Sequence, residues 1–436
     1  MQTAEKKLMA DRKIVPRIKL PVEFDVKLPP CKNYVLSNGV EVFSIDMGGE
    51  DTLMLNWVFY AGNWFEKKKM SASAANYLLK NGTTRLTAFG VNEHFEYYGS
   101  YLNRTCYNET AELTLHCLNK HVNELIPVVA EIITDSVFPE EEISIYKQNS
   151  QQRLKVSLQK CEFVAGQLID AYLFGENHPY GKYSQLEDYE ELQREEIVEF
   201  YQRYYQKGRC VIFAAGKLPS DLPMQLEQYF GKLPLRSHTI KDEAVEHVTV
   251  PGQQKKQNII IDPQGVQSAI RIARSFPNRH HPDFQKAMVL NNVYGGFFGS
   301  RLMANIREEK GYTYGIYSYL MNHVEQSGWM ISTEAGRDVS EATVNEIFKE
   351  MQRIREELID EEELMVTRNY MIGTILGDLD GPFQVAARWK NLILNDLEED
   401  YFYRGIETIK KVTPEDLQQI AQKYLRPEEF YELLVI

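Results

Sequence analysis

Two kinds of hydrophobic spacing alternate along the chain, and each indicates a different element. Residues 34–46, YVLSNGVEVFSID, alternate apolar and polar positions around an Asn-Gly pair, which predicts a β-hairpin. Residues 52–62 predict a further strand, and residues 258–263 and 268–276 predict strands at the start of the second half. Apolar positions at helical spacing follow these strands in both halves, over residues 71–80, 93–101, 121–136, 140–173, 282–293, 340–357 and 361–376.

One helix-and-strand pattern occurs twice, about half a chain apart. Its apolar residues are spaced i, i+3, i+7 and i+8, and a short apolar strand follows each copy. The matching positions are Ile197, Phe200, Tyr204 and Tyr205 in the first copy and Leu417, Ile420, Tyr424 and Leu425 in the second. Since 417 minus 197 is 220 and the same shift fits the other three positions, the pattern suggests a duplicated domain of about that length.

A polar stretch with proline and glycine near its ends, residues 234–256, separates the two halves. We therefore expect an N-terminal domain over residues 1–235, a linker over 236–256 and a C-terminal domain over 257–436. Strands that pair antiparallel come first in each half and long helices follow, which is typical of an α+β fold rather than of alternating βαβ units.

Composition narrows the possible functions only by exclusion. The 436 residues are 43% hydrophobic, which is too apolar for an intrinsically disordered chain. The net charge of −13 disfavours binding to nucleic acid or to a membrane surface by charge. No run reaches the ~18–20 apolar residues that a membrane span needs. Residues 1–21 lack the apolar core of a secretory signal, so we expect a cytoplasmic protein, or a periplasmic one if a leader was removed.

Cysteine and histidine spacing gives no sign of a metal or disulfide framework. The five cysteines are odd in number, widely spaced and without a C-x-x-C pair, which favours unpaired thiols in a reducing compartment. The nine histidines include no pair at i, i+4 around a glutamate. No nucleophile elbow, phosphate-binding loop or dinucleotide fingerprint occurs either. We expect no metal and no other cofactor in this chain.

The most distinctive stretch is residues 291–320, NNVYGGFFGSRLMANIREEKGYTYGIYSYL. Its glycine-rich turn leads into a helix for which Ser300 is the expected N-cap and Gly311 the expected C-terminal stop. A strand follows, so Arg307 and Tyr314 stand seven residues apart across a helix–strand junction. A guanidinium and a phenol held together could donate hydrogen bonds to a peptide carbonyl, although a surface arginine beside a half-buried tyrosine is the plainer alternative.

This stretch resembles the C-terminal signature of the pitrilysin-like metallopeptidases, the inverzincins that include the mitochondrial processing peptidases. The family form is G-G-x-x-x-S-R-L, then x-x-x-[LI]-R-E-x-x-G-x-x-Y, and its arginine and tyrosine bind the substrate backbone. The resemblance assigns these substrate-binding places to Arg307 and Tyr314. It extends to residues 36–40, 61–66, 81–83, 91–103 and 178–192. It implies two homologous peptidase-like domains, each an antiparallel sheet covered by helices.

The sequence departs from the family at the zinc motif. Active members carry H-x-x-E-H on a helix that ends in a K-G-T-like turn, with two histidine ligands and a glutamate base. Counted back from Asn81-Gly82-Thr83, those places hold Ser73, Asn76 and Tyr77. The third family ligand is a glutamate some 75–80 residues further on, but no carboxylate occurs between Glu142 and Glu162. The degenerate motif predicts a chain without zinc.

Some family members work as pairs in which one subunit holds the zinc and the other the arginine–tyrosine pair. The resemblance therefore implies a non-catalytic subunit of a heteromeric metallopeptidase, which binds peptide for a homologous H-x-x-E-H partner that carries the zinc. The alternative is a non-proteolytic scaffold, like the core proteins of respiratory complexes, or a peptide-binding homodimer without a catalytic partner.

Overall fold

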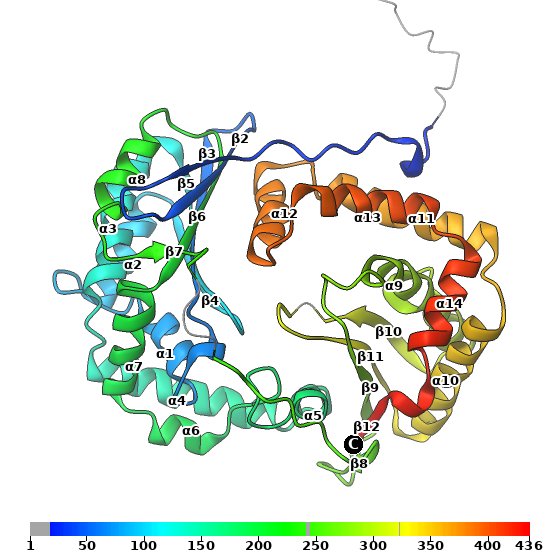
Figure 1. Ribbon diagram of the computed structural model, residues 1–436. Coiled ribbons are helices and arrows are strands. Elements are labelled where there is room, and N and C mark those ends of the chain that lie inside the picture. The colour runs from blue at the N-terminus through cyan, green and yellow to red at the C-terminus, as the bar shows by residue number, and fades with distance from the viewer. Residues whose placement is uncertain (1–17, 241–244, 322) are drawn as a thin grey trace, which may run out of the picture.

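The computed structural model describes residues 18–240, 245–321 and 323–436, which form two α+β halves side by side (Figure 1). Each half consists of a β-sheet with most of its helices on the face turned away from the other half (Figure 1). The fold class expected from the sequence is thereby confirmed. The sheets are mixed rather than purely antiparallel, because each contains parallel pairs beside its antiparallel ones.

The first sheet, within the described residues, has the order β1-β2-β6-β3-β5-β4, with β7 also paired to β6. The predicted hairpin is β1–β2, and the predicted strand after it is β3. The parallel pairs are β2–β6 and β6–β7. The strands are β1 (Lys32–Val35), β2 (Glu41–Asp46), β3 (Thr52–Phe59), β4 (Tyr101–Cys106), β5 (Ala111–Leu118), β6 (Arg209–Gly216) and β7 (Arg236–Ser237).

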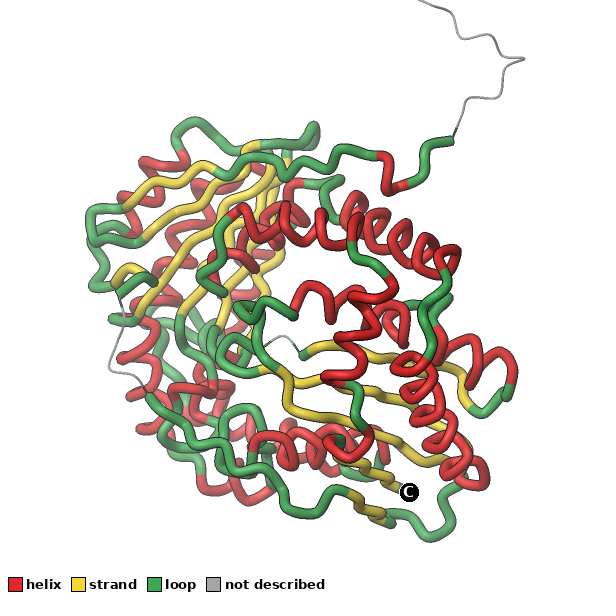
Figure 2. Tube along the Cα trace, turned by 45° about the vertical axis from the view of Figure 1, so that its right-hand side comes forward, coloured by secondary structure: helices red, strands yellow, loops and turns green. Residues whose placement is uncertain are grey.

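The second sheet has the order β10-β11-β9-β12-β8 in the described part of the chain. Its one parallel pair there is β12–β8, where the last strand of the chain lies beside the first strand of this half. Figure 2 shows the two sheets as separate groups of yellow strands. The strands are β8 (Lys256–Ile259), β9 (Gln267–Phe276), β10 (Thr313–Leu320), β11 (Ser327–Gly336) and β12 (Tyr431–Val435).

The helices follow the predicted pattern with two main differences. The helix expected over residues 140–173 is two helices, α4 and α5, and four further helices, α6, α8, α12 and α13, were not predicted. The first-half helices are α1 (Ser71–Leu78), α2 (Ala88–Tyr97), α3 (Val122–Asp135), α4 (Glu140–Ser157), α5 (Cys161–Phe174), α6 (Leu186–Glu191), α7 (Arg194–Tyr201) and α8 (Leu222–Phe230). The second-half helices are α9 (Phe284–Asn291), α10 (Ser340–Glu356), α11 (Glu361–Gly377), α12 (Pro382–Leu394), α13 (Glu399–Lys411) and α14 (Pro414–Tyr424).

Both faces of each sheet carry buried residues, because each half receives a helix from the other. Alternate residues of a strand point to opposite faces. On β9, Ile270 and Ile272 therefore join the core under α9, α10 and α14, whereas Ala269 and Ala273 pack against α5 of the first half. On the first sheet, Ile45 and Ala215 pack against α12 of the second half.

The two exchanged helices are equivalent members of the duplication. Adding 220 to Cys161–Phe174 gives residues 381–394, which match α12 to within one residue. The same shift carries α4 onto α11, α7 onto α14 and β6 onto β12, to within three residues at each end. The structure thus contains a repeated unit whose equivalent helices are swapped between the halves.

The domain limits expected from the sequence do not coincide with the packing units. β7 continues the first sheet beyond residue 235, and part of the predicted linker, residues 241–244, lies outside the described residues. Val26 and Leu28, close to the start of the chain, belong to the core of the second half.

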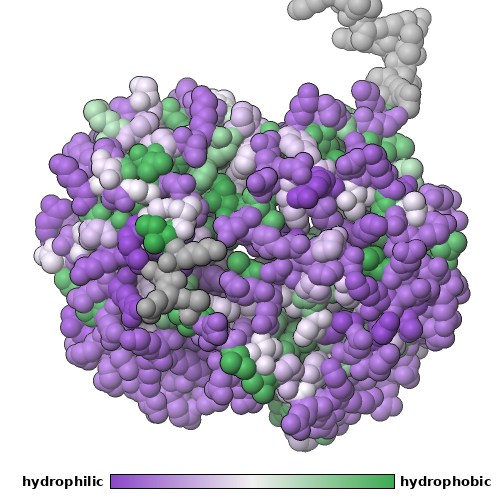
Figure 3. Space-filling view, viewed as in Figure 1, coloured by the Kyte–Doolittle hydropathy of each residue, from purple (hydrophilic) through white to green (hydrophobic). Residues whose placement is uncertain are grey.

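Hydrophilic residues predominate on the face seen in Figure 3. No helix in the described residues is long and apolar enough to span a membrane.

Candidate functional site

The structure brings Arg307 and Tyr314 together. Arg307 lies in a π-helical segment, η6 (Met303–Glu309), and Tyr314 is the second residue of β10. Gly311 stops the helix with a φ of +66°, as its position predicted, so that the chain reverses into the strand. The Nε atom of Arg307 then donates a hydrogen bond to the carbonyl oxygen of Tyr314 at 3.0 Å. The pair is therefore a local unit joined through the backbone.

A β-bulge turns Tyr314 away from the sheet. The pairing of β10 with β11 shifts register between Thr313 and Ile316. Two hydroxyls stabilise the bulge: Thr313 Oγ1 accepts from the Gly315 amide at 3.1 Å, and Thr333 Oγ1 donates to the Gly315 carbonyl at 2.9 Å. As a result, Tyr314 is 96% exposed.

An aromatic ring supports the guanidinium from below. The guanidinium carbon of Arg307 lies 4.7 Å from the ring centroid of Phe298, which is itself largely exposed. One terminal nitrogen of Arg307 contacts Glu308. Neither its other terminal nitrogen nor the Tyr314 hydroxyl has a hydrogen-bond partner among the described residues. Both groups are thus free to donate to an external carbonyl oxygen.

The face of α1 that corresponds to the zinc motif is occupied by protein contacts. Ser73 Oγ donates to the Met70 carbonyl at 3.1 Å. Asn76 is buried, and its amide donates to the hydroxyl of Tyr205 at 3.1 Å. The ring of Tyr77 packs on the ring of Tyr146, with centroids 5.0 Å apart. None of these side chains is arranged as a ligand set.

Helix α4 provides neutral groups where the third family ligand was sought. Tyr146, Ser150 and Leu154 are its buried residues facing inward, together with Ile143. Burial raises the pKa of Tyr146 well above its usual value, although a hydrogen bond with Ser73 opposes the shift. The phenol therefore stays protonated and does not serve as an anionic ligand at neutral pH.

A cation lies beside these residues. The guanidinium carbon of Arg104, on β4, is 4.5 Å from the ring centroid of Tyr77. A positive charge next to hydroxyl and amide groups opposes the binding of a second positive ion. No group of three or more His, Cys, Asp or Glu side chains suited to a metal occurs in the ranges that the structure describes. The residues present at the family's zinc position do not fit that metal.

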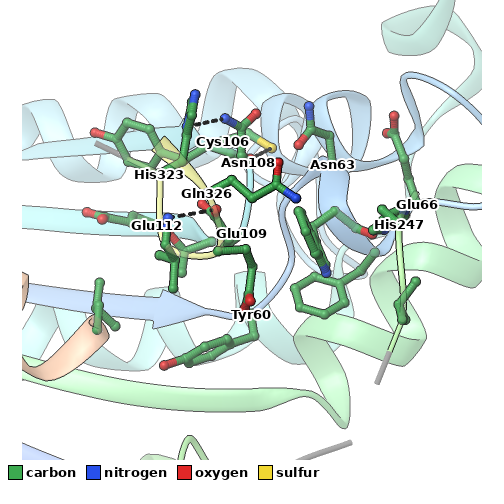
Figure 4. Close-up of a pocket in the computed structure, with 18 of the residues that line it drawn as sticks. Tyr60, Asn63, Glu66, Cys106, Asn108, Glu109, Glu112, His247, His323 and Gln326 are labelled. Carbon is green, nitrogen blue, oxygen red and sulfur yellow. Dashed lines mark hydrogen bonds between the residues drawn. The ribbon is translucent and has the colours of Figure 1, made fainter. Parts of the chain in front are cut away.

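A cavity of about 1430 Å³ opens between the two halves. Figure 4 shows acidic, amide and imidazole side chains from both halves around it, including Glu66, Asn108 and His323. Ser73 lines this cavity, whereas Arg307 and Tyr314 do not. The structure therefore separates α1, which borders the internal cavity, from the exposed pair of Arg307 and Tyr314.

Two polar clusters join the halves at this cavity. In the first, Lys390 of α12 donates to the Glu112 carboxylate at 2.7 Å and 2.9 Å and to Asn56 Oδ1 at 3.2 Å. Glu112 and Asn56 belong to the first sheet. The sequence could not predict that Lys390 contacts Glu112 and Asn56, because their contact depends on the exchange of α12.

The second cluster surrounds the loop after β10. The amide of Val324 donates to Glu109 Oε1 at 3.3 Å, and Glu109 also accepts from the hydroxyl of Tyr180. His323 stacks on Tyr180 with ring centroids 4.1 Å apart. Burial lowers the pKa of His323 to about 4, with a smaller contribution from His178, whereas burial raises the pKa of Glu109. The imidazole of His323 is therefore neutral at neutral pH, and the carboxyl group of Glu109 ionises less readily than an exposed one.

Comparison with known proteins gives one family match and several whole-length structural matches. The model of the peptidase M16 inactive domain matches residues 191–371. The uncharacterized zinc protease YmxG of Bacillus subtilis is 22% identical over 362 residues, which cover 82% of this chain and 86% of that protein.

Two solved structures share the fold over nearly the whole chain. The M16 inactive-domain structure from Pseudomonas fluorescens has a TM-score of 0.83 at 20% identity and covers 93% of this chain and 98% of that one. A protease from Helicobacter pylori has a TM-score of 0.84 at 15% identity and covers 94% of this chain and 100% of that one.

Proposed function

We propose that this chain, which is a non-catalytic pitrilysin-like (M16) homologue, is the zinc-free subunit of a heteromeric metallopeptidase. In this proposal it binds a peptide for a homologous H-x-x-E-H subunit, and the reaction takes place where the two chains face each other. The observation that supports it is the contrast between two sites in one molecule. The side chains of α1, the helix at the place of the family's zinc motif, are neutral, whereas Arg307 and Tyr314 are hydrogen-bonded to each other and Tyr314 is exposed.

The pair has donors suited to a peptide carbonyl. The free terminal N–H of Arg307 and the hydroxyl of Tyr314 both donate, and neither accepts a proton at neutral pH. Two donors aimed at one carbonyl oxygen would orient the peptide bond and stabilise the negative charge that develops on this oxygen when water attacks. Phe298 supports the guanidinium of Arg307, and the bulge in β10 directs the Tyr314 side chain outward before the peptide arrives.

Reconstitution with the H-x-x-E-H subunit from the same cell tests the proposal. The mixture should form a complex and cleave peptide, whereas this chain alone should not. Arg307→Ala or Tyr314→Phe should lower turnover about 10²- to 10³-fold, the usual effect of losing one such donor, without breaking the complex. Tyr317→Phe is the matched control, because Tyr317 is another exposed tyrosine of β10.

Two results would contradict the proposal in different ways. Stoichiometric zinc and peptidase activity in the isolated chain would overturn it. If instead the complex forms but both variants turn over peptide like the wild type, the scaffold alternative replaces peptide binding as the role of this subunit.

A further inference from the structure

Two cations next to the degenerate zinc helix have no acidic partner. Arg104 extends from β4 toward α1, and Lys80 follows the end of that helix. Neither forms an ion pair with any residue that the structure describes. Lys80 makes only a long contact, 3.5 Å from its ammonium nitrogen to the Leu102 carbonyl, and the Nε atom of Arg104 is buried without a hydrogen-bond partner.

This arrangement is unusual in a chain with a net charge of −13. Desolvation lowers the pKa of both groups, and the charge of Arg104 further lowers that of Lys80, so the two cations repel each other. Glu96 attracts Lys80 without reaching ion-pair distance. The other groups that act on Arg104 are the phenols of Tyr77 and Tyr101, which are neutral. Buried charge of one sign is costly unless an opposite charge approaches.

The two cations are partly buried and lie close to an edge of the first sheet. β4 is the last strand of its sheet in the described residues, so one of its edges has no neighbouring strand. Its final residue, Cys106, lines the cavity between the halves, as does Ser73 of α1. Arg104 and Cys106 are two residues apart on the strand and point to the same face. Arg104 does not itself line the cavity, but it is next to Cys106 on this face, on the side of the strand that faces α1.

We propose that Arg104 and Lys80 form a binding site for a carboxylate group of the bound peptide, at the place where the family's zinc helix lies. A guanidinium suits this role because its parallel N–H groups match the two oxygens of a carboxylate. The hydroxyls of Tyr77 and Tyr101 add neutral donors nearby. The choice of a peptide as ligand rests on the proposed function, whereas the need for an anion rests on the two unpaired cations alone. The site thus selects anionic peptides.

Binding of short peptides to the isolated, full chain tests this inference by titration calorimetry. Three octapeptides of alanine and serine differ only at the central residue and at the C-terminal group. The first has a central glutamate and an amidated C-terminus, the second has glutamine there and the same amide, and the third has glutamine and a free C-terminus. We expect the first, the third or both to bind at least tenfold more tightly than the second. Which one does so tells a side-chain carboxylate from a terminal one.

Variants then locate the site. Arg104→Gln should remove the preference without changing the affinity for the uncharged peptide, and Arg104→Lys should keep part of it. Arg203→Gln is the matched control, because Arg203 also packs on a tyrosine ring, at 5.4 Å from Tyr204, but on an exposed surface. If Arg104→Gln does not fold, as judged by circular dichroism, Lys80→Gln serves in its place.

Several outcomes overturn the inference. They are equal affinity for the three peptides, no binding of any of them at millimolar concentration, a preference that survives in both Arg104→Gln and Lys80→Gln, or stoichiometric zinc retained by the wild type. The experiment needs neither a partner nor turnover. A failed reconstitution with an intact carboxylate preference therefore contradicts only the proposed function. Loss of the preference with an active complex contradicts only this site.

Discussion

Asp170 gives a stability prediction that can be checked in the isolated chain. It lies on α5, the helix that packs against the second sheet. Burial raises its pKa to about 7, although the nearby charge of Arg271 partly offsets the shift. Arg271 does not neutralise it fully, because its Nη2 atom donates to Glu334 at 2.8 Å and to the Glu162 carbonyl at 3.3 Å.

The sign and size of the effect follow from proton linkage. The folded state, with a pKa of about 7 for Asp170, binds more protons than the unfolded state, in which the ordinary value of 3.8 applies. Stability from this group is therefore lost as pH rises through that window. Between pH 5 and pH 8, the folded state holds the extra proton over about two pH units, from pH 5 to about pH 7. At 1.36 kcal/mol per unit, the unfolding free energy falls by about 3 kcal/mol over this range.

Asp170→Asn removes the titrating group and keeps a polar side chain of similar size. Relative to wild type, the variant should gain about 3 kcal/mol more unfolding free energy at pH 8 than at pH 5. Urea unfolding at pH 5, 6.5 and 8, followed by tryptophan fluorescence and circular dichroism, measures this difference. Asp51→Asn is the control: Lys217 lowers the pKa of this exposed carboxyl, so it is ionised in both states above pH 5. A difference between Asp170→Asn and wild type that does not change with pH would refute the reasoning.

Three further substitutions test contacts that position the site. Lys390→Met leaves the Glu112 carboxylate without its cation and should cost about 3 kcal/mol in urea unfolding, part of which Glu112→Gln in the same chain restores; an unchanged midpoint would contradict the inter-half pair. Thr333→Val removes a hydroxyl from the bulge and should cost about 1–2 kcal/mol, whereas Thr333→Ser should cost less, and equal losses would assign the effect to packing. Gly311→Ala should cost about 1–2 kcal/mol in thermal unfolding, because alanine resists a φ of +66°; an unchanged melting temperature would mean that the turn relaxes.

Local patterns predicted the elements well where the pattern itself fixes the structure. The Asn-Gly pair predicted the β1–β2 hairpin, and the stop at Gly311 depends on one residue's conformational freedom. Ser300 was expected to cap the helix that carries Arg307, but its hydroxyl is buried without a partner among the described residues. Its carbonyl nevertheless accepts from the Ala304 amide at 2.9 Å, so the helix begins where expected without the side-chain cap.

The exchange of α5 and α12 could not be predicted, for a physical reason. A hydrophobic helix face specifies that it must be covered, but not which sheet covers it. Ala165 and Ile169 of α5 pack against the small residues Ala269 and Ala273 of the second sheet. Nothing in the sequence of α5 favours this sheet over the first. The exchange also explains why α12 was not predicted. The residues that it packs against, Ile45 and Ala215, lie more than 160 residues away in the sequence.

The sequence led us to expect no zinc ligands at Ser73, Asn76 and Tyr77, but it could not predict which side chains contact these residues. Ser73, Asn76 and Tyr77 are set by the chain, whereas Tyr146, Tyr205 and Arg104 reach them from α4, from the segment after α7 and from β4. Buried polar groups need hydrogen-bond partners, and these partners come from elements that are distant in the sequence. Tyr146 and Tyr205 provide neutral partners and complete the packing. Arg104 is different, because it adds a charge that nothing in the described residues neutralises. Filling the space beside α1 does not require a charged residue, whereas binding a carboxylate group does.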